Sequence, residues 1–203
     1  MLSSAYITEH KILKYDNTEE NIPISIRYND AIDKLLASNY SGWIFFVHND
    51  FSILESIDNI VDKLEHTHLY GPIGAILKGS EKIIYGQILQ GHNGGLIYHG
   101  TKINEPTLVD TVDCQCQCLF LHTDLLKKYN LRFDENEALS FHQYVEDFCL
   151  NANINYGIKT YAVQMNCKHF SWGKLNNDFK LAIDYINSKY SDKAWAGTCT
   201  HVY

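Results

Sequence analysis

The run Trp43–Val47 (Trp-Ile-Phe-Phe-Val) decides the expected fold, because it is a continuous apolar stretch of aromatic and β-branched residues. Such a run is typical of a strand buried on both faces of a sheet. It ends abruptly in the polar turn His48, Asn49 and Asp50. Ligands of open α/β sheets bind beyond the carboxyl ends of strands, so Asp50 stands where a metal or cofactor is expected. The alternative is that Asp50 only begins a helix, where an N-cap carboxylate is favoured.

Strand-like and helix-like segments alternate along the rest of the chain. Residues 51–66, for example, carry apolar side chains at helical spacing and charged side chains between them, which predicts an amphipathic helix. The alternation favours an α/β sheet. The expected helices cover residues 29–38, 51–66, 123–129, 138–153 and 174–190, and the expected strands cover residues 5–8, 24–27, 43–47, 71–77, 82–88, 112–121 and 156–163.

Length, charge and composition limit the class of protein. The 203 residues, of which 45% are hydrophobic, suit one globular domain over residues 1–203. The net charge of -7 argues against nucleic acid as a partner, because that binding rests on clustered Lys and Arg. No apolar run approaches the ~20 residues of a membrane span, and the first residues lack the layout of a signal peptide. We therefore expect a cytoplasmic protein.

Cysteine spacing predicts reduced thiols. Cys114, Cys116 and Cys118 alternate along one expected strand, where neighbours on one face are poorly placed to bond each other. A zinc site built from these three is the competing interpretation, but their spacing lacks the CxxC turn that structural zinc sites favour.

A pair of carboxylates lies in the expected helix 138–153. Its apolar positions place His142 and Glu146 one turn apart, with Asp147 near the edge of the buried face. Partial desolvation would raise the pKa of Asp147 and make it a stronger base, which suits removal of a proton from a hydroxyl group. The alternative is a solvated helix face with no catalytic role.

His169 is the third candidate. It follows a strand-like segment, and we expect it to lie near Asp50 and to ligate a metal, since imidazole and carboxylate together suit Mn²⁺ or a similar divalent ion. Taken alone, it is a loop histidine. The residues after Tyr190, among them Trp195, either cover the site or pack on the surface, and we expect the surface.

Five pieces of sequence, in this order, resemble the GT-A glycosyltransferases related to family 2, in particular a short group with a His-x-Asp turn. The resemblance covers roughly residues 24–190. The pieces are Trp43 to Asp50, the Gly-Pro-Ile-Gly-Ala run at 71–75, Val112-Asp113, the Phe-His-Gln-Tyr run at 141–144 leading to Asp147, and His169 with Ser171 and Gly173. Similar domains occur in proteins of large viruses that glycosylate capsids, such as those of chlorella viruses, and a viral origin would place the protein in the host cytoplasm.

The resemblance implies an α/β fold of the GT-A (Rossmann-like nucleotide-diphospho-sugar transferase) type, with a mixed, mainly parallel central sheet flanked by helices. It implies a metal-dependent transferase that moves a hexose or deoxyhexose from a nucleotide-diphosphate sugar, by family frequency a UDP-sugar, to a hydroxyl of a glycan or glycoprotein. The divalent cation would be Mn²⁺, with Mg²⁺ as the alternative.

The resemblance also implies residue roles. Asp50 and His169 would bind the metal, and Asp147 would be the base of an inverting displacement. Donor-binding candidates are Thr8, Glu9, Asn29, His48 and Asn49, and acceptor-binding or sugar-binding candidates are Asp113, His142 and Glu146.

Two alternatives to this function stay open. One is a retaining glycosyltransferase on the same fold, in which Asp147 positions the acceptor or the sugar. The other is a non-catalytic domain that binds a carbohydrate or a nucleotide sugar, which the single carboxylate of the turn at Asp50 favours. A nucleotidyltransferase is less favoured, because the Gly-rich, basic phosphate loop of that class is not visible.

Overall fold

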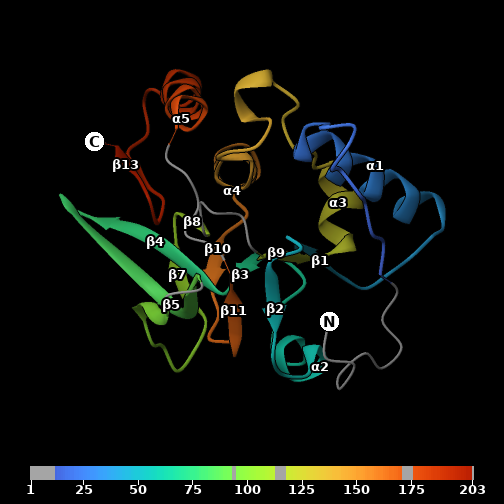
Figure 1. The fold of residues 1–203 in the computed structure, drawn as a ribbon, viewed down its shortest axis with the longest axis horizontal. Coiled ribbons are helices and arrows are strands. Elements are labelled where there is room, and N and C mark those ends of the chain that lie inside the picture. The colour runs from blue at the N-terminus through green and yellow to red at the C-terminus, as the bar shows by residue number, and fades with distance from the viewer. Residues whose placement is uncertain (1–11, 93–94, 113–117, 171–175, 203) are drawn as a thin grey trace.

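The structure is a computed structural model that describes residues 12–92, 95–112, 118–170 and 176–202 (Figure 1). The described helices are α1 (Ile24–Ala37), α2 (Ile57–Val61), α3 (Thr123–Tyr129), α4 (Tyr144–Tyr156), α5 (Asn177–Lys189) and a 3-10 turn (Glu137–Leu139). The strands are β1 (Trp43–Val47), β2 (Phe51–Ile53), β3 (Leu69–Gly71), β4 (Ile73–Lys78), β5 (Glu81–His92), β6 (Gly95–Thr101), β7 (Thr107–Val109), β8 (Thr111–Val112), β9 (Cys118–His122), β10 (Thr160–Ala162), β11 (Cys167–His169), β12 (Trp195–Ala196) and β13 (His201–Val202).

The first sheet separates two hydrophobic cores. Its strand order is β1-β9-β3-β10-β7, and β1 pairs antiparallel with β9. Successive side chains of a strand point to opposite faces. Ile44 and Phe46 of β1 accordingly enter the core beneath α1, α3 and α4, whereas Phe45 packs against the core shared with the second sheet. In Figure 1, α1, α4 and α5 lie on one side of the strands and α2 on the other.

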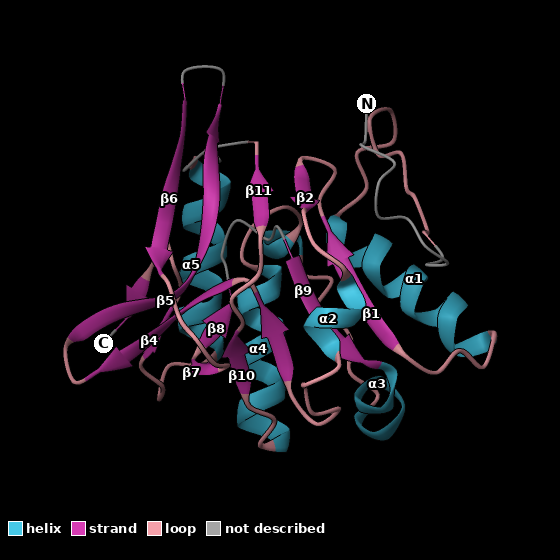
Figure 2. Ribbon diagram, turned by 90° about the horizontal axis from the view of Figure 1, so that it is seen from below, coloured by secondary structure: helices cyan, strands magenta, loops and turns pink. Residues whose placement is uncertain are grey.

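The second sheet is built mainly from hairpins. Its order is β2-β11-β5-β4-β8, with β6 also pairing with β5. The long strand β5 pairs antiparallel with β4 along its first half and with β6 along its second half. Figure 2 shows β5 and β6 projecting together from the body of the molecule.

The expected mainly parallel, Rossmann-like sheet of the GT-A type is wrong. Among the described strands, only β10 with β3 and β11 with β5 pair in parallel. The strands form two mixed, mostly antiparallel sheets and a small third sheet of β12 and β13. The physical reason is the length of the connections. Parallel neighbours need crossovers of about a dozen residues or more, whereas β4 and β5 are joined by the two residues Gly79 and Ser80.

Several expected elements are corrected locally. Residues 24–27 belong to helix α1, which begins after Pro23, a residue whose fixed φ suits the start of a helix. The expected helix 51–66 is instead β2 followed by the short α2, because residues 51–53 pair with β11. The strands at 43–47 and 82–88 and the helix at 123–129 are confirmed. The expected strand at 5–8 lies outside the described residues.

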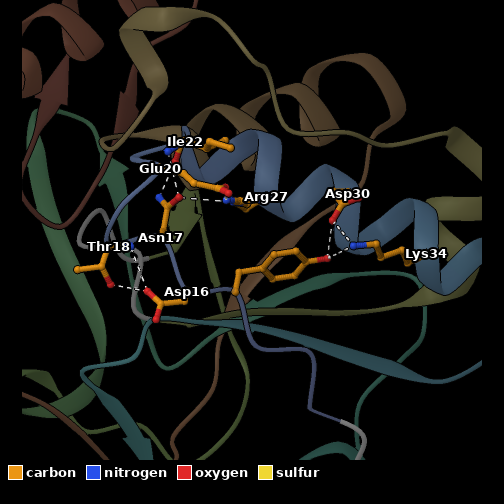
Figure 3. Close-up of polar contacts among 9 residues, drawn as sticks. Asp16, Asn17, Thr18, Glu20, Ile22, Arg27, Asp30 and Lys34 are labelled. Atoms are coloured by element: carbon orange, nitrogen blue, oxygen red, sulfur yellow. Dashed lines mark hydrogen bonds and ion pairs between the residues drawn. The ribbon is translucent and has the colours of Figure 1, made fainter.

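The segment before α1 is tied to that helix by polar contacts (Figure 3). The Asn17 side chain accepts a hydrogen bond from the backbone of Ile22 at 3.0 Å and donates one to its carbonyl at 2.6 Å. Asp30 accepts hydrogen bonds from the hydroxyl of Tyr15 and the ammonium of Lys34, both at 2.7 Å. These contacts hold the chain entry against the outer face of α1.

The C-terminal tail is part of the core, contrary to the expectation that it packs on the surface. Trp195 in β12 is 1% exposed. Asp110 accepts hydrogen bonds from the backbone amides of Leu77 at 2.9 Å and Ala196 at 3.1 Å, so one carboxylate joins β4 to the tail. Burial raises the pKa of Asp110.

The cysteines follow the expectation in part. Cys118, Cys149 and Cys167 are buried thiols outside any disulfide. Cys199 is disulfide-bonded, which corrects the expectation of reduced thiols, and its partner lies outside the described residues, as do Cys114 and Cys116. The tail is therefore fixed by a covalent bond as well as by packing.

Replacement of Gly86 tests the bend of β5. Gly86 has a φ of +83° at a bulge, and an added Cβ would lie 2.2 Å from the carbonyl oxygen of Pro72. Gly79 has a φ of +66° but open space around its Cβ position. We expect Gly86→Ala to lower the free energy of unfolding by about 3 kcal/mol, from backbone strain plus overpacking. The matched control Gly79→Ala should cost about 1 kcal/mol, from strain alone. Equal losses in urea denaturation would contradict this account.

Candidate active site

Strand pairing brings together the two residues that the sequence proposes as metal ligands. β2 starts directly after Asp50, and its first residue, Phe51, is paired with His169 of β11. The backbone amide of Phe170 donates a hydrogen bond to the carbonyl oxygen of Asp50 at 2.9 Å. The two side chains consequently meet, with His169 Nε2 3.3 Å from Asp50 Oδ2.

The electrostatics of this pair favour an ionised carboxylate with spare ligand atoms. The hydrogen bond from His169 holds the pKa of Asp50 below its usual value. The His169 side chain is only 3% exposed. Asp50 Oδ1 and His169 Nδ1 are both buried and have no hydrogen-bond partner in the part of the chain that the structure describes. Buried polar atoms are normally paired, so each of these two atoms lacks a partner that a bound group would supply. Because His169 meets Asp50 through Nε2 and its Nδ1 faces the other way, an ion shared by both residues would have to replace the present contact.

His48 connects the Asp50 turn to the start of α4. Its Nε2 contacts the hydroxyl of Tyr144, the first residue of that helix. Burial lowers the pKa of His48 to about 4, so the imidazole is neutral near pH 7. A neutral imidazole adds no positive charge to the turn and can act as a hydrogen-bond partner or a ligand.

Gln143 is a site residue that the sequence does not reveal. It precedes α4 with a φ of +59°, in the left-handed region that residues other than glycine seldom adopt. Its side chain is fully buried, and both amide atoms lack a hydrogen-bond partner among the described residues. Strained residues of this kind cluster at ligand-binding sites. No sequence signal distinguishes it, because the apolar pattern places it inside the expected helix 138–153, whereas α4 begins only at Tyr144.

Asp147 lies in a buried ion-pair network and is only 1% exposed. Its Oδ1 accepts hydrogen bonds from Lys189 Nζ at 2.7 Å and from the hydroxyl of Tyr190 at 3.0 Å. Lys189 also bonds Asp134 at 2.7 Å, and that carboxylate accepts from Tyr185. Asp147 thus joins α4 to α5.

Two opposing effects act on the pKa values of this network. Burial raises the pKa of Asp147, and the nearby charge of Lys189 opposes that shift. Burial also disfavours the ammonium of Lys189, but Asp147 and Asp134 outweigh it and raise the pKa of Lys189. The ammonium facing two carboxylates at 2.7 Å stays charged at neutral pH, and it keeps Asp147 available as an anion.

The remaining acceptor candidates do not join the Asp50 turn. His142 is half-buried and packs edge-on against Phe179 of α5, with ring centroids 5.7 Å apart. Glu146 is fully buried and faces the tail, since its Oε1 lies 3.4 Å from where a Cβ on Gly197 would be. Asp113 lies outside the described residues.

Of the described donor-binding candidates other than His48, only Asn49 lies beside Asp50. Asn49 is exposed beside Asp50. Asn29 is buried, and its amide bonds the backbone of Phe133 in both directions at 2.9 Å and Glu135 at 2.8 Å, so its hydrogen-bonding groups serve the fold. Thr8 and Glu9 lie outside the described residues.

The Asp50–His169 pair offers two protein ligands. Among the described residues, the one group of three His, Cys, Asp or Glu side chains close enough to share an ion lies elsewhere, at His66, His122 and Asp124. Two ligands suffice for an ion that is also held by substrate, because Mg²⁺ and similar hard ions are commonly bound through one or two carboxylates plus substrate phosphates.

The chain matches no protein-family model and no curated protein. None of the described helices is long and apolar enough to cross a membrane.

Lys189→Met tests the buried network. The substitution leaves Asp147 as a buried charge held only by Tyr190, and we expect the free energy of unfolding to fall by about 2 kcal/mol. Lys180→Met, in an exposed pair with Asp184 on the same helix, is the matched control and should have little effect. Adding Asp147→Asn to Lys189→Met should recover part of the loss, because the buried group is then neutral. Thermal and urea denaturation measure all three, and equal stability of the two lysine variants would refute the network's role.

Proposed function

We propose that the protein is a metal-dependent glycosyltransferase. It would move a hexose or deoxyhexose from a nucleotide-diphosphate sugar, with uridine as the nucleoside, to a hydroxyl group of an acceptor. The observation that carries the proposal is the Asp50–His169 pair, in which one carboxylate oxygen and one imidazole nitrogen are buried without a hydrogen-bond partner among the described residues. Carboxylate with imidazole is a donor set that suits Mn²⁺. The order of sequence motifs supports the same assignment.

The start of α4 supports a phosphate-bearing donor. Helix N-termini attract anions through their free amide groups. The Gln143 amide is unsatisfied there among the described residues, and the contact between His48 and Tyr144 links this helix end to the Asp50 turn. However, Glu146 and Asp147 occupy the first turn of α4 and already oppose an incoming anion. A diphosphate at this position therefore needs additional positive charge.

The metal fits that need. Bound at Asp50 and His169, Mn²⁺ or Mg²⁺ would neutralise charge on the departing diphosphate. In an inverting displacement the acceptor oxygen forms a bond to the anomeric carbon, the bond from that carbon to the diphosphate oxygen breaks with its electron pair, and the acceptor proton passes to a carboxylate. Asp147 is the proposed base, because its burial raises its pKa and Lys189 keeps it ionised at neutral pH.

The burial of Asp147 favours a second candidate. A base that is 1% exposed and already accepts two hydrogen bonds is poorly placed to receive a proton from an acceptor. In a retaining transferase, or in a domain that only binds the nucleotide sugar, Asp147 would position neighbouring groups instead. The two tests below separate these candidates.

Calorimetric titration with UDP and UDP-glucose, with and without Mn²⁺, tests the donor site. We expect binding that requires Mn²⁺ and that weakens at least tenfold in Asp50→Asn, a substitution that preserves shape and removes the ligand charge. Asp62→Asn, in the exposed cap of α2, is the matched control and should bind as the wild type does. Binding that survives Asp50→Asn would overturn the assigned metal site.

The stereochemistry of slow UDP-glucose hydrolysis tests the role of Asp147. With water as the acceptor, inversion of the α-linked donor releases β-glucose first, and retention releases α-glucose, which proton NMR distinguishes. We expect β-glucose, and a rate at least about 100-fold lower in Asp147→Asn, because that is the scale of general-base catalysis. Release of α-glucose supports the retaining mechanism. Donor binding without any release of sugar supports the non-catalytic domain.

A further inference from the structure

A second cluster of metal-ligating side chains lies at the opposite end of β1 from Asp50. His122 ends β9 and is paired with Trp43, the first residue of β1. His66 lies in the turn before β3, and β3 pairs with β9. Asp124 stands in the first turn of α3, two residues after His122. The turn before β3, the end of β9 and the start of α3 thus bring these side chains to one place, roughly 16 Å along β1 from His48 at about 3.3 Å per residue.

The distances within the cluster fit one ion. Asp124 Oδ2 lies 3.0 Å from His122 Nδ1 and 3.7 Å from His66 Nδ1. One ligand atom from each residue lies within 4.8 Å of the other two. Ligands around tetrahedral Zn²⁺, at bond lengths near 2.1 Å, are separated by about 3.4 Å. The observed separations lie on both sides of that value, so the three ligand atoms are close enough to share an ion once the ring of His66 tilts out of its stack on His122.

The two imidazole rings face each other with unusual closeness. Their centroids are 3.7 Å apart and their planes differ by 6°. This stacking brings a nitrogen of each ring close to the Asp124 carboxylate. His66 is about half exposed and is free to tilt toward a shared ion, whereas His122 is buried and fixed by its strand.

A purely structural role explains only part of the cluster. His122 caps α3 by accepting a hydrogen bond from the amide of Asp124 at 3.3 Å, a long contact. That cap accounts for His122 but not for the position of His66, which the cap does not need. The exposed carboxylate of Asp124, which lies beside a nitrogen of each ring, is likewise not required by the cap.

We propose that His66, His122 and Asp124 bind a divalent ion of the Zn²⁺ class. Two imidazoles and one carboxylate suit such an ion, and three protein ligands leave one position open to water. The bound ion links the turn before β3 to the start of α3. The site does not rest on the proposed transferase function, since it shares no residue with the Asp50–His169 pair.

Titration calorimetry of the full chain with Zn²⁺ tests the proposal. We expect one Zn²⁺ per chain, and affinity at least tenfold lower in His66→Ala and in Asp124→Asn, whose side chains are both about half exposed and so tolerate replacement. His68→Ala, in the same turn, is the matched control and should bind Zn²⁺ as the wild type does. Unchanged affinity in His66→Ala and Asp124→Asn would overturn the proposal.

Trp43 supplies a second readout. Its ring centroid lies 5.5 Å from that of His66 and 5.7 Å from that of His122. Cu²⁺, which quenches nearby indoles, should reduce the fluorescence of Trp43, and Zn²⁺ should reverse the effect by competition. The quenching should be lost in His66→Ala. Loss in Asp50→Asn instead would assign the ion to the Asp50–His169 pair and would also overturn the proposal. Absence of Zn²⁺ binding alongside Mn²⁺-dependent UDP binding would remove this site and leave the transferase assignment standing.

Discussion

The antiparallel pairing of β1 with β9 is the constraint on which the rest of the structure depends. All five residues of β1 are paired with β9, from Trp43 opposite His122 to Val47 opposite Cys118. On one face of these strands, alternate side chains pack in the core beneath α1, α3 and α4. On the other face, they pack in the core shared with the second sheet. A shift of one residue would exchange these two sets, so the apolar content of both cores fixes the register.

The same pairing determines where polar groups can gather. The central residues of β1 pack in the two hydrophobic cores, so polar side chains gather only at its two ends. At the far end, the chain turns through His48 and Asp50 and returns as β2, which pairs with β11 and so brings His169 to Asp50. At the near end, Trp43 and His122 sit in register, and the β3–β9 pairing adds His66. Both candidate metal sites thus lie at the ends of one strand.

The sequence predicts local features that depend on few residues, and it fails where distant partners decide. The apolar run at β1 has one plausible structure, and the contact between Asp50 and His169 was expected from residue type. Residues 51–53 fit a helical pattern equally well, but pairing with β11, more than a hundred residues away, makes them a strand. Sheet direction depends on such pairings. Neither the backbone of Gln143 nor the bond from Lys189 to Asp147 leaves a periodic trace in the sequence.

The charges around α4 explain why a metal and an anionic donor would be used together. The first turn of this helix holds the buried carboxylates of Glu146 and Asp147. Lys189 forms an ion pair with Asp147, but it also pairs with Asp134. A diphosphate placed at this helix end would lie close to these carboxylates, in a chain whose net charge is -7. Coulomb repulsion at short range in a partly buried site is costly, and a divalent ion beside His48 removes it. Under the proposed function, donor affinity and metal occupancy would therefore depend on each other.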